Sequence, residues 1–187
     1  PSLHEDETMT TARDVVDFWL SLPPSAHFKK DPALDAELTK RFGDALAAAR
    51  RGEHDDWAAT SEGALGLIIL LDQFSRNIHR DTPHMFATDA KALQVAKELI
   101  ASGEHAAMPT DHQKWLFMPF MHSEDLADQE RCIELCRAAN LEENIPYAIE
   151  HADIIRRFGR FPHRNAILGR QSTPDEIEFL EQGGFSG

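Results

Sequence analysis

Cysteine and basic residues are scarce in this chain of 187 residues. Its two cysteines, Cys132 and Cys136, are four residues apart, which suits one face of a helix better than a disulfide. We interpret them as small buried side chains rather than a redox pair. The 19 Lys and Arg residues are outnumbered by 32 Asp and Glu residues, giving a net charge of -13. Because so acidic a chain repels a phosphate backbone, we expect no nucleic-acid partner.

Long apolar runs and several common site signatures are also missing. The longest apolar run, from Ala64 to Leu71, is far shorter than the ~20 residues of a membrane-spanning helix, so we expect no membrane segment. Residues 1–8 are polar and acidic, which favours a cytoplasmic protein without a signal peptide. The sequence has no His-Glu-x-x-His or paired Cys-x-x-Cys pattern, no Gly-rich phosphate loop and no Gly-x-Ser-x-Gly turn. We therefore predict neither a metal nor a cofactor.

What the sequence does have is helical periodicity along most of its length. Apolar residues recur every three or four positions, no long stretch alternates with period two, and no Asn-Gly or Asp-Gly hairpin turn occurs. This pattern predicts an all-α fold, a single-domain bundle of about seven or eight helices in antiparallel pairs. We expect the domain to span residues 11–187 and residues 1–10 to form an N-terminal tail.

Capping residues and helix breakers indicate where the helices begin and end. A polar residue precedes each expected helix, and Gly, Pro or Asn follows most of them. Ser123, followed by two acids, is read as one such cap, and Pro119 predicts a kink or an early end in the helix before it. The expected helices are 11–22, 31–51, 61–74, 82–102, 110–121, 123–139, 142–158 and 173–182.

The first of three polar clusters is DQFSRN, at the end of a helix that is apolar on all sides. Asp72 and Arg76 are four residues apart and can pair if the helix continues, and so can Gln73 and Asn77. The cluster either ties down a helix end or carries polar groups into a cleft. The sequence gives both interpretations about equal weight.

The second cluster is MPFMHSED, which joins two expected helices. His122 precedes a helix start, where backbone N–H groups favour an anion. Glu124 and Asp125 are acids that can occupy the same position. His122 is therefore either a hydrogen-bonded core residue or a base at a site.

The third cluster, FGRFPHRN, combines cationic and aromatic residues in one turn. Gly159 ends the preceding helix and Pro162 favours an extended backbone before it, so the polar side chains project from irregular structure between anchoring phenylalanines. An arginine buried there needs an acid, carbonyl groups or a ligand, and one left facing a cleft would form an anion site. The polar side chains of this turn are Arg160, His163, Arg164 and Asn165.

Three segments, in this order, resemble an uncharacterised and mainly bacterial family called domain of unknown function 924. They are LLDQFSRNI (70–78), MPFMHSEDLADQE (118–130) and FGRFPHRNAILGRQSTPDE (158–176). The resemblance extends from about residue 12 to residue 180. It implies a tetratricopeptide-like helical fold, but no established reaction, cofactor or catalytic residue.

Two hypotheses for function follow. In the first, the protein is an enzyme or a binding protein with a pocket for a small anion, such as a carboxylate or phosphate. The ligand-binding candidates are Asp72, Arg76, Asn77, Arg160, Arg164 and Asn165, and the catalytic candidates are His122 or His163 as acid or base with Glu124 as orienting partner. In the second, the protein is a non-enzymatic helical scaffold that binds a peptide or protein partner, and the polar clusters are structural clamps.

Overall fold

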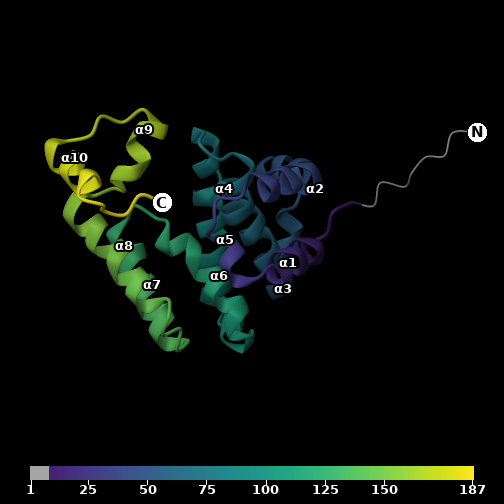
Figure 1. Cartoon of the computed structure of the whole chain (residues 1–187). Coiled ribbons are helices and arrows are strands. Elements are labelled where there is room, and N and C mark those ends of the chain that lie inside the picture. The colour runs from purple at the N-terminus through teal and green to yellow at the C-terminus, as the bar shows by residue number, and fades with distance from the viewer. Residues whose placement is uncertain (1–8) are drawn as a thin grey trace, which may run out of the picture.

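The computed structural model describes residues 9–187, and the regular structure of this part of the chain is helical, with no strand (Figure 1). A π-helical turn, Ile69–Phe74, joins α3 to α4, so the described chain has nine separate helices. The all-α prediction is confirmed, with slightly more helices than expected. Residues 1–8 of the predicted tail lie outside the described residues. The helices are α1 (Ala12–Ser21), α2 (Pro32–Arg50), α3 (Ser61–Ile68), α4 (Ser75–Ile78), α5 (Asp89–Ser102), α6 (Thr110–Met121), α7 (Leu126–Ala138), α8 (Ile145–Phe158), α9 (Asn165–Leu168) and α10 (Pro174–Glu181).

Local capping signals fix several of these helix ends. Thr11 begins α1 and Thr173 begins α10, each with a reciprocal capping box to the third residue of its helix. Asp31 caps α2 by accepting hydrogen bonds from two backbone N–H groups. Gly159 ends α8 with a φ of 73°, a left-handed conformation that glycine adopts without steric cost.

Three predicted helices begin later in the structure than the sequence predicts. The helix predicted from residue 142 is α8, which begins at Ile145. The helix expected from Thr82 is a short 3₁₀ turn, Pro83–Phe86, and α5 begins later because the Thr88 hydroxyl donates a hydrogen bond to the carbonyl of Leu71 on the π-helical turn. The cap of α7 is Asp125 rather than Ser123, since Asp125 accepts from two backbone N–H groups of the first turn. α6 continues two residues past its internal proline before it ends.

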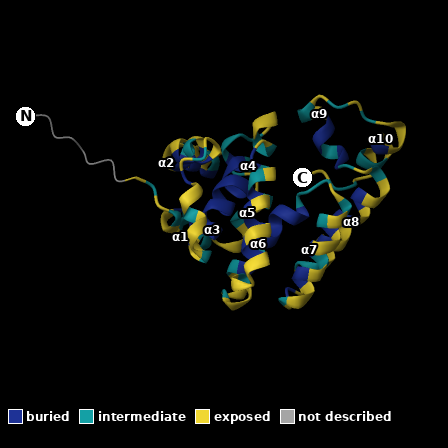
Figure 2. Cartoon of the chain, turned by 180° about the vertical axis from the view of Figure 1, so that it is seen from behind, coloured by how far each residue is buried: buried dark blue, intermediate teal, exposed yellow. Residues whose placement is uncertain are grey.

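The all-apolar helix α3 lies at the centre of the core, as its sequence predicts. All residues from 63 to 75 are buried, and Figure 2 shows buried residues concentrated around α3 while the outer face of α8 is exposed. Gly66 lets α1 approach closely, because a Cβ atom there would lie 2.7 Å from the carbonyl oxygen of Ala12. α1 packs against both α3 and the π-helical turn that follows it.

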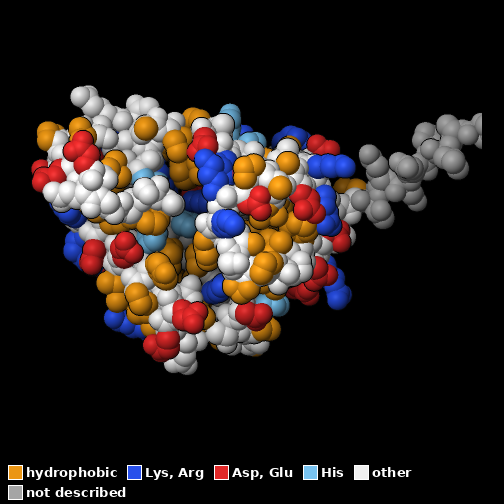
Figure 3. Space-filling model, in the orientation of Figure 1, with side chains coloured by type: hydrophobic (Ala, Val, Ile, Leu, Met, Phe, Trp, Pro, Cys, Tyr) orange, Lys and Arg blue, Asp and Glu red, His pale blue; other side chains and the backbone are white. Residues whose placement is uncertain are grey.

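The helices form two lobes (Figure 1), and the molecular surface is hollowed between them (Figure 3). The first lobe, residues 9–121, contains α1 to α6 and most of the main hydrophobic core. The second lobe, residues 122–187, contains α7 to α10. α7 and α8 pack side by side there, and Ile154, Ile155 and Phe161 form a second, smaller core. No helix in the described part of the chain is long and apolar enough to cross a membrane.

Candidate functional site

A cavity of about 350 Å³ lies between the two lobes. The first lobe contributes the 3₁₀ turn Pro83–Phe86 and the start of α5, and the second contributes the loop after α6 and the segment from Arg164 to Leu168. The space-filling view is hollowed there, and His and Lys or Arg side chains are visible in the hollow (Figure 3). The cavity is lined by Pro83, Phe86, Ala87, Asp89, Ala90, His122, Glu124, Arg164 and Leu168.

The π-helical turn places Asp72 beneath this cavity. Such turns add a residue to a helical turn and are frequent at functional sites. The Asp72 side chain is 0% exposed, and its Oδ1 lies 2.7 Å from Nδ1 of His122. Burial alone would raise the pKa of Asp72, but the His122 imidazole and the Arg76 guanidinium lower it below its usual value.

Asp72 fixes the orientation of the His122 ring. Because a carboxylate only accepts hydrogen bonds, Nδ1 carries the hydrogen of this contact and Nε2 is left for another partner. The His122 side chain is 17% exposed and lines the cavity. We predicted Glu124 as the orienting partner, but the structure assigns that contact to Asp72, 50 residues away in the sequence.

Arg76 is paired with two aspartates within the protein. It forms a bidentate ion pair with Asp89, at 2.7 and 2.9 Å, and donates to the carbonyl of Asp72 at 2.8 Å. Burial would lower the pKa of Arg76, but the two aspartates raise it. Asn77 points elsewhere and donates to Asp35 of α2. Both side chains thus have acidic partners among the described residues, unlike the free cation that an anion site needs.

Arg164 is buried without a carboxylate partner. Its residue is 6% exposed, and its guanidinium carbon lies 4.5 Å from the ring centre of Phe86 and 4.7 Å from that of Phe161. Among residues 9–187, its side chain makes one hydrogen bond, from Nη2 to the carbonyl of His122 at 2.9 Å, and Nε has no partner. Burial and the charge of Arg76 lower the pKa of Arg164 to about 10.

Glu124 belongs to a structural clamp in the second lobe. It forms a bidentate pair with Arg170, at 2.8 and 3.1 Å, and accepts from the backbone N–H of Phe161 at 2.6 Å. Burial would raise the pKa of Glu124, but Arg170 and this backbone contact lower it. Arg170 was not among the predicted site residues, although it lies within the third family-like segment.

Arg160 and Asn165 are also paired within the second lobe, away from the cavity. Arg160 forms a bidentate pair with Glu176 at 3.0 and 2.7 Å, and Asn165 donates to the same carboxylate at 3.1 Å. Arg160 adds a bond to the carbonyl of Gln171. These contacts hold α10 against the turn that carries Arg164, so we assign both side chains a structural role.

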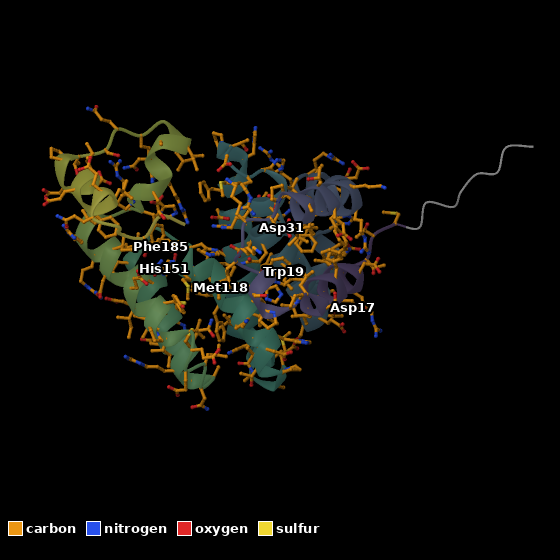
Figure 4. All side chains as sticks on the ribbon, in the orientation of Figure 1. Asp17, Trp19, Asp31, Met118, His151 and Phe185 are labelled. Atoms are coloured by element: carbon orange, nitrogen blue, oxygen red, sulfur yellow. The ribbon has the colours of Figure 1, made fainter. Side chains whose placement is uncertain are left out.

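His163 does not line the cavity. Its ring lies 5.8 Å from that of Phe161 and 5.0 Å from that of Phe185, and the His151 ring also packs against Phe185, at 4.6 Å. Figure 4 shows Phe185 and His151 together on the inner side of the second lobe. Burial and the charge of Arg164 lower the pKa of His163 to about 3, which keeps its ring neutral.

The structure thus brings together three of the predicted residues, Asp72, His122 and Arg164, and pairs most of the others internally. Sequence reasoning missed Phe86 and Asp89, which contribute to the cavity wall from the first lobe. Both lie in the segment that we predicted as an uninterrupted helix. No sequence signal marked them, because their contacts join residues that are distant along the chain.

Comparison with known proteins places the chain in a family. Residues 15–184 match the model of a family described as bacterial protein of unknown function (DUF924), and the chain belongs to that family. A solved structure of a protein of unknown function from Agrobacterium tumefaciens is similar, with 45% sequence identity and a TM-score of 0.87 over 92% of this chain and 97% of that one. A comparison with curated proteins gave no match.

Proposed function

We propose that this member of the family binds a small anionic molecule in the cavity between its lobes, with Arg164 as the anchoring cation. The observation that supports the proposal is the burial of this guanidinium without a carboxylate partner. An unpaired buried charge costs several kcal/mol, and a bound anion would offset that cost. The other arginines near the cavity, Arg76 and Arg170, already have bidentate partners.

His122 gives the site a candidate general base or acid. Asp72 holds its Nδ1, while the ring lines the same cavity as Arg164. The residues that line the cavity in the described part of the chain carry no hydroxyl or thiol group. A reaction in this cavity would therefore use His122 as acid or base toward the bound molecule or water, rather than a serine, threonine or cysteine nucleophile.

The alternative hypothesis is a helical scaffold that binds a peptide, with the polar clusters as internal clamps. Two of the pairs fit that description, Arg160 with Glu176 and Arg170 with Glu124. Arg164 does not, because it clamps no acid. This difference favours the anion site, and the tetratricopeptide-like character of the fold remains a prediction from the family resemblance.

A thermal-shift screen with small organic and inorganic anions tests the proposal. An anion at 100 times its Kd stabilises the native state by about 2.7 kcal/mol, which raises Tm by roughly 5–10 °C in a domain of this size. We expect such a shift in the parent protein and its loss in Arg164→Met.

The chain offers a control in Arg41, whose guanidinium carbon also lies close to two aromatic ring centres, at 4.8 and 5.0 Å, but outside the cavity. Arg41→Met should keep the response to the anion. If no anion shifts Tm, or if both variants lose the shift equally, Arg164 does not anchor a ligand.

A further inference from the structure

The walls of the cavity carry information about the kind of anion that fits. We infer that the ligand is a monocarboxylate with a small apolar body, rather than a phosphate or a dicarboxylate. This inference rests on the proposed anion site. Three features of the cavity support this inference: the charges on its walls, the covered faces of the Arg164 guanidinium, and the apolar lining opposite it.

The wall charges favour a single negative charge on the ligand. Asp89 and Glu124 both line the cavity, one on each lobe. Each forms an ion pair with another arginine, and Arg164 contributes the unpaired cation among the lining residues. The first negative charge of a ligand would pair with Arg164, whereas a second would find no other unpaired arginine or lysine among the lining residues, because Asp89 and Glu124 already hold Arg76 and Arg170. A dianion is therefore disfavoured.

The packing of Arg164 favours a planar anionic group. Aromatic rings lie against the guanidinium, because the ring centres of Phe86 and Phe161 are 4.5 and 4.7 Å from the guanidinium carbon. Nε is buried, so an anion must approach along the edge formed by the two Nη groups, of which Nη2 donates to the carbonyl of His122. A carboxylate binds such an edge with both oxygens in the plane. A phosphate has further oxygens out of that plane, which would meet the aromatic rings without hydrogen-bond donors.

The rest of the lining is apolar. Pro83, Phe86, Ala87, Ala90 and Leu168 form the walls around the polar groups. The volume of about 350 Å³ is at the small end of the range of roughly 300–1,000 Å³ for ligand sites. These walls match a compact hydrocarbon or aromatic group attached to the carboxylate, and they offer few partners to a second polar group.

A homologous series of linear carboxylates tests this inference by calorimetry. Each methylene that enters the apolar cavity should strengthen binding roughly fourfold, from acetate through butyrate to hexanoate, until the cavity is full. Phosphate and succinate should bind at least tenfold more weakly than butyrate. Arg164→Met should abolish binding of the whole series, and the control Arg41→Met should not.

Ala90→Leu tests the apolar wall separately, because Ala90 is exposed at the cavity and its replacement adds bulk without disturbing the core. This variant should weaken hexanoate binding more than acetate binding. If phosphate or succinate binds more tightly than the monocarboxylates and this binding requires Arg164, the inference about the ligand is wrong but the proposed anion site is supported. An absence of binding by every anion would overturn both. Affinities that do not change with chain length would also overturn the inference.

Discussion

Two buried histidines in the second lobe should make the protein less stable in mild acid. Burial lowers the pKa of His151 to about 4, although a hydrogen bond to the carbonyl of Tyr147 opposes the shift, and burial with the charge of Arg164 lowers the pKa of His163 to about 3. In the unfolded chain both rings have the ordinary histidine pKa of about 6.5. The native state therefore excludes two protons that the unfolded state takes up.

The size of the change in the free energy of unfolding follows from these pKa values. Because the native pKa lies below the unfolded one, the stability from each neutral ring is fully present above about pH 6.5 and falls as the pH drops toward the native pKa. Between about pH 7.5 and 5.5, each histidine should lower the free energy of unfolding by about 1.3 kcal/mol. The pair should therefore cost about 2.6 kcal/mol, a large share of a stability of roughly 5–15 kcal/mol.

Between about pH 7.5 and 5.5, the change in stability reports the histidines and not the carboxylic acids. The lowered pKa values of Asp72, Glu124 and Glu176 make their contributions disappear only at lower pH. His27 and His105 also have lowered pKa values from burial, so they act in the same direction as the pair. The lower limit also stays above the isoelectric point of about 5.1, where association would disturb the measurement.

Urea denaturation followed by tryptophan fluorescence at several pH values measures the effect. His163→Phe, with Phe161 and Phe185 beside it, should remove about half of the pair's contribution to the pH slope. His79→Gln is a suitable control, because His79 is only partly buried in the first lobe and should contribute less. A free energy of unfolding that stays constant across this window would refute the reasoning, as would a His163→Phe slope equal to that of the parent.

Four substitutions test the other physical claims through the change in stability. Asp72→Asn removes a fully buried charge that contacts both His122 and Arg76, so it should lower the free energy of unfolding by about 3 kcal/mol in urea denaturation. A change within experimental error would contradict the claim that these contacts stabilise the protein. Arg164→Met should leave Tm unchanged or raise it in differential scanning calorimetry, since it removes an unpaired buried charge; a large drop would make this arginine structural. Gly66→Ala should lower the free energy of unfolding by about 1–3 kcal/mol because of its contact with α1, whereas Gly43→Ala in α2, where the added Cβ would lie 4.0 Å from Cγ2 of Thr39, should raise it by up to about 1 kcal/mol; equal effects would exclude the packing explanation.

The fold was predictable where a signal and its effect lie within one helical turn. The caps Thr11, Asp31 and Thr173 act on backbone groups two or three residues away, and the helices begin where these residues predict. The helix expected from Thr82 failed for the opposite reason. A hydrogen bond from Thr88 to a carbonyl 17 residues earlier decides where α5 starts, and periodicity carries no trace of it.

The site was predictable only in part for the same physical reason. The pairing of Asp72 with Arg76 follows from their spacing of four residues, and the structure contains it at 3.4 Å. The contact between Asp72 and His122 joins two sequence clusters, so neither cluster predicts it alone. Glu124 was expected beside His122 because it is near in sequence, but the backbone of the second lobe turns its carboxylate toward Arg170.

Arg160 and Arg164 show most directly what sequence leaves undecided. They are the same residue type, four positions apart in one turn, and either could have faced a ligand. The capping box of α10 supplies Glu176 as a partner for Arg160, whereas the fold places Arg164 against Phe86 and Phe161, and no carboxylate of the described residues pairs with it. Arg164 is also the more deeply buried of the two, since its residue is 6% exposed and the Arg160 side chain is 29% exposed. Burial of a guanidinium costs more free energy when fewer protein oxygens reach it, so burial and pairing together distinguish the two arginines. The oxygens that reach them belong to residues 11 to 42 positions away along the chain, which is why the motif itself does not predict the difference.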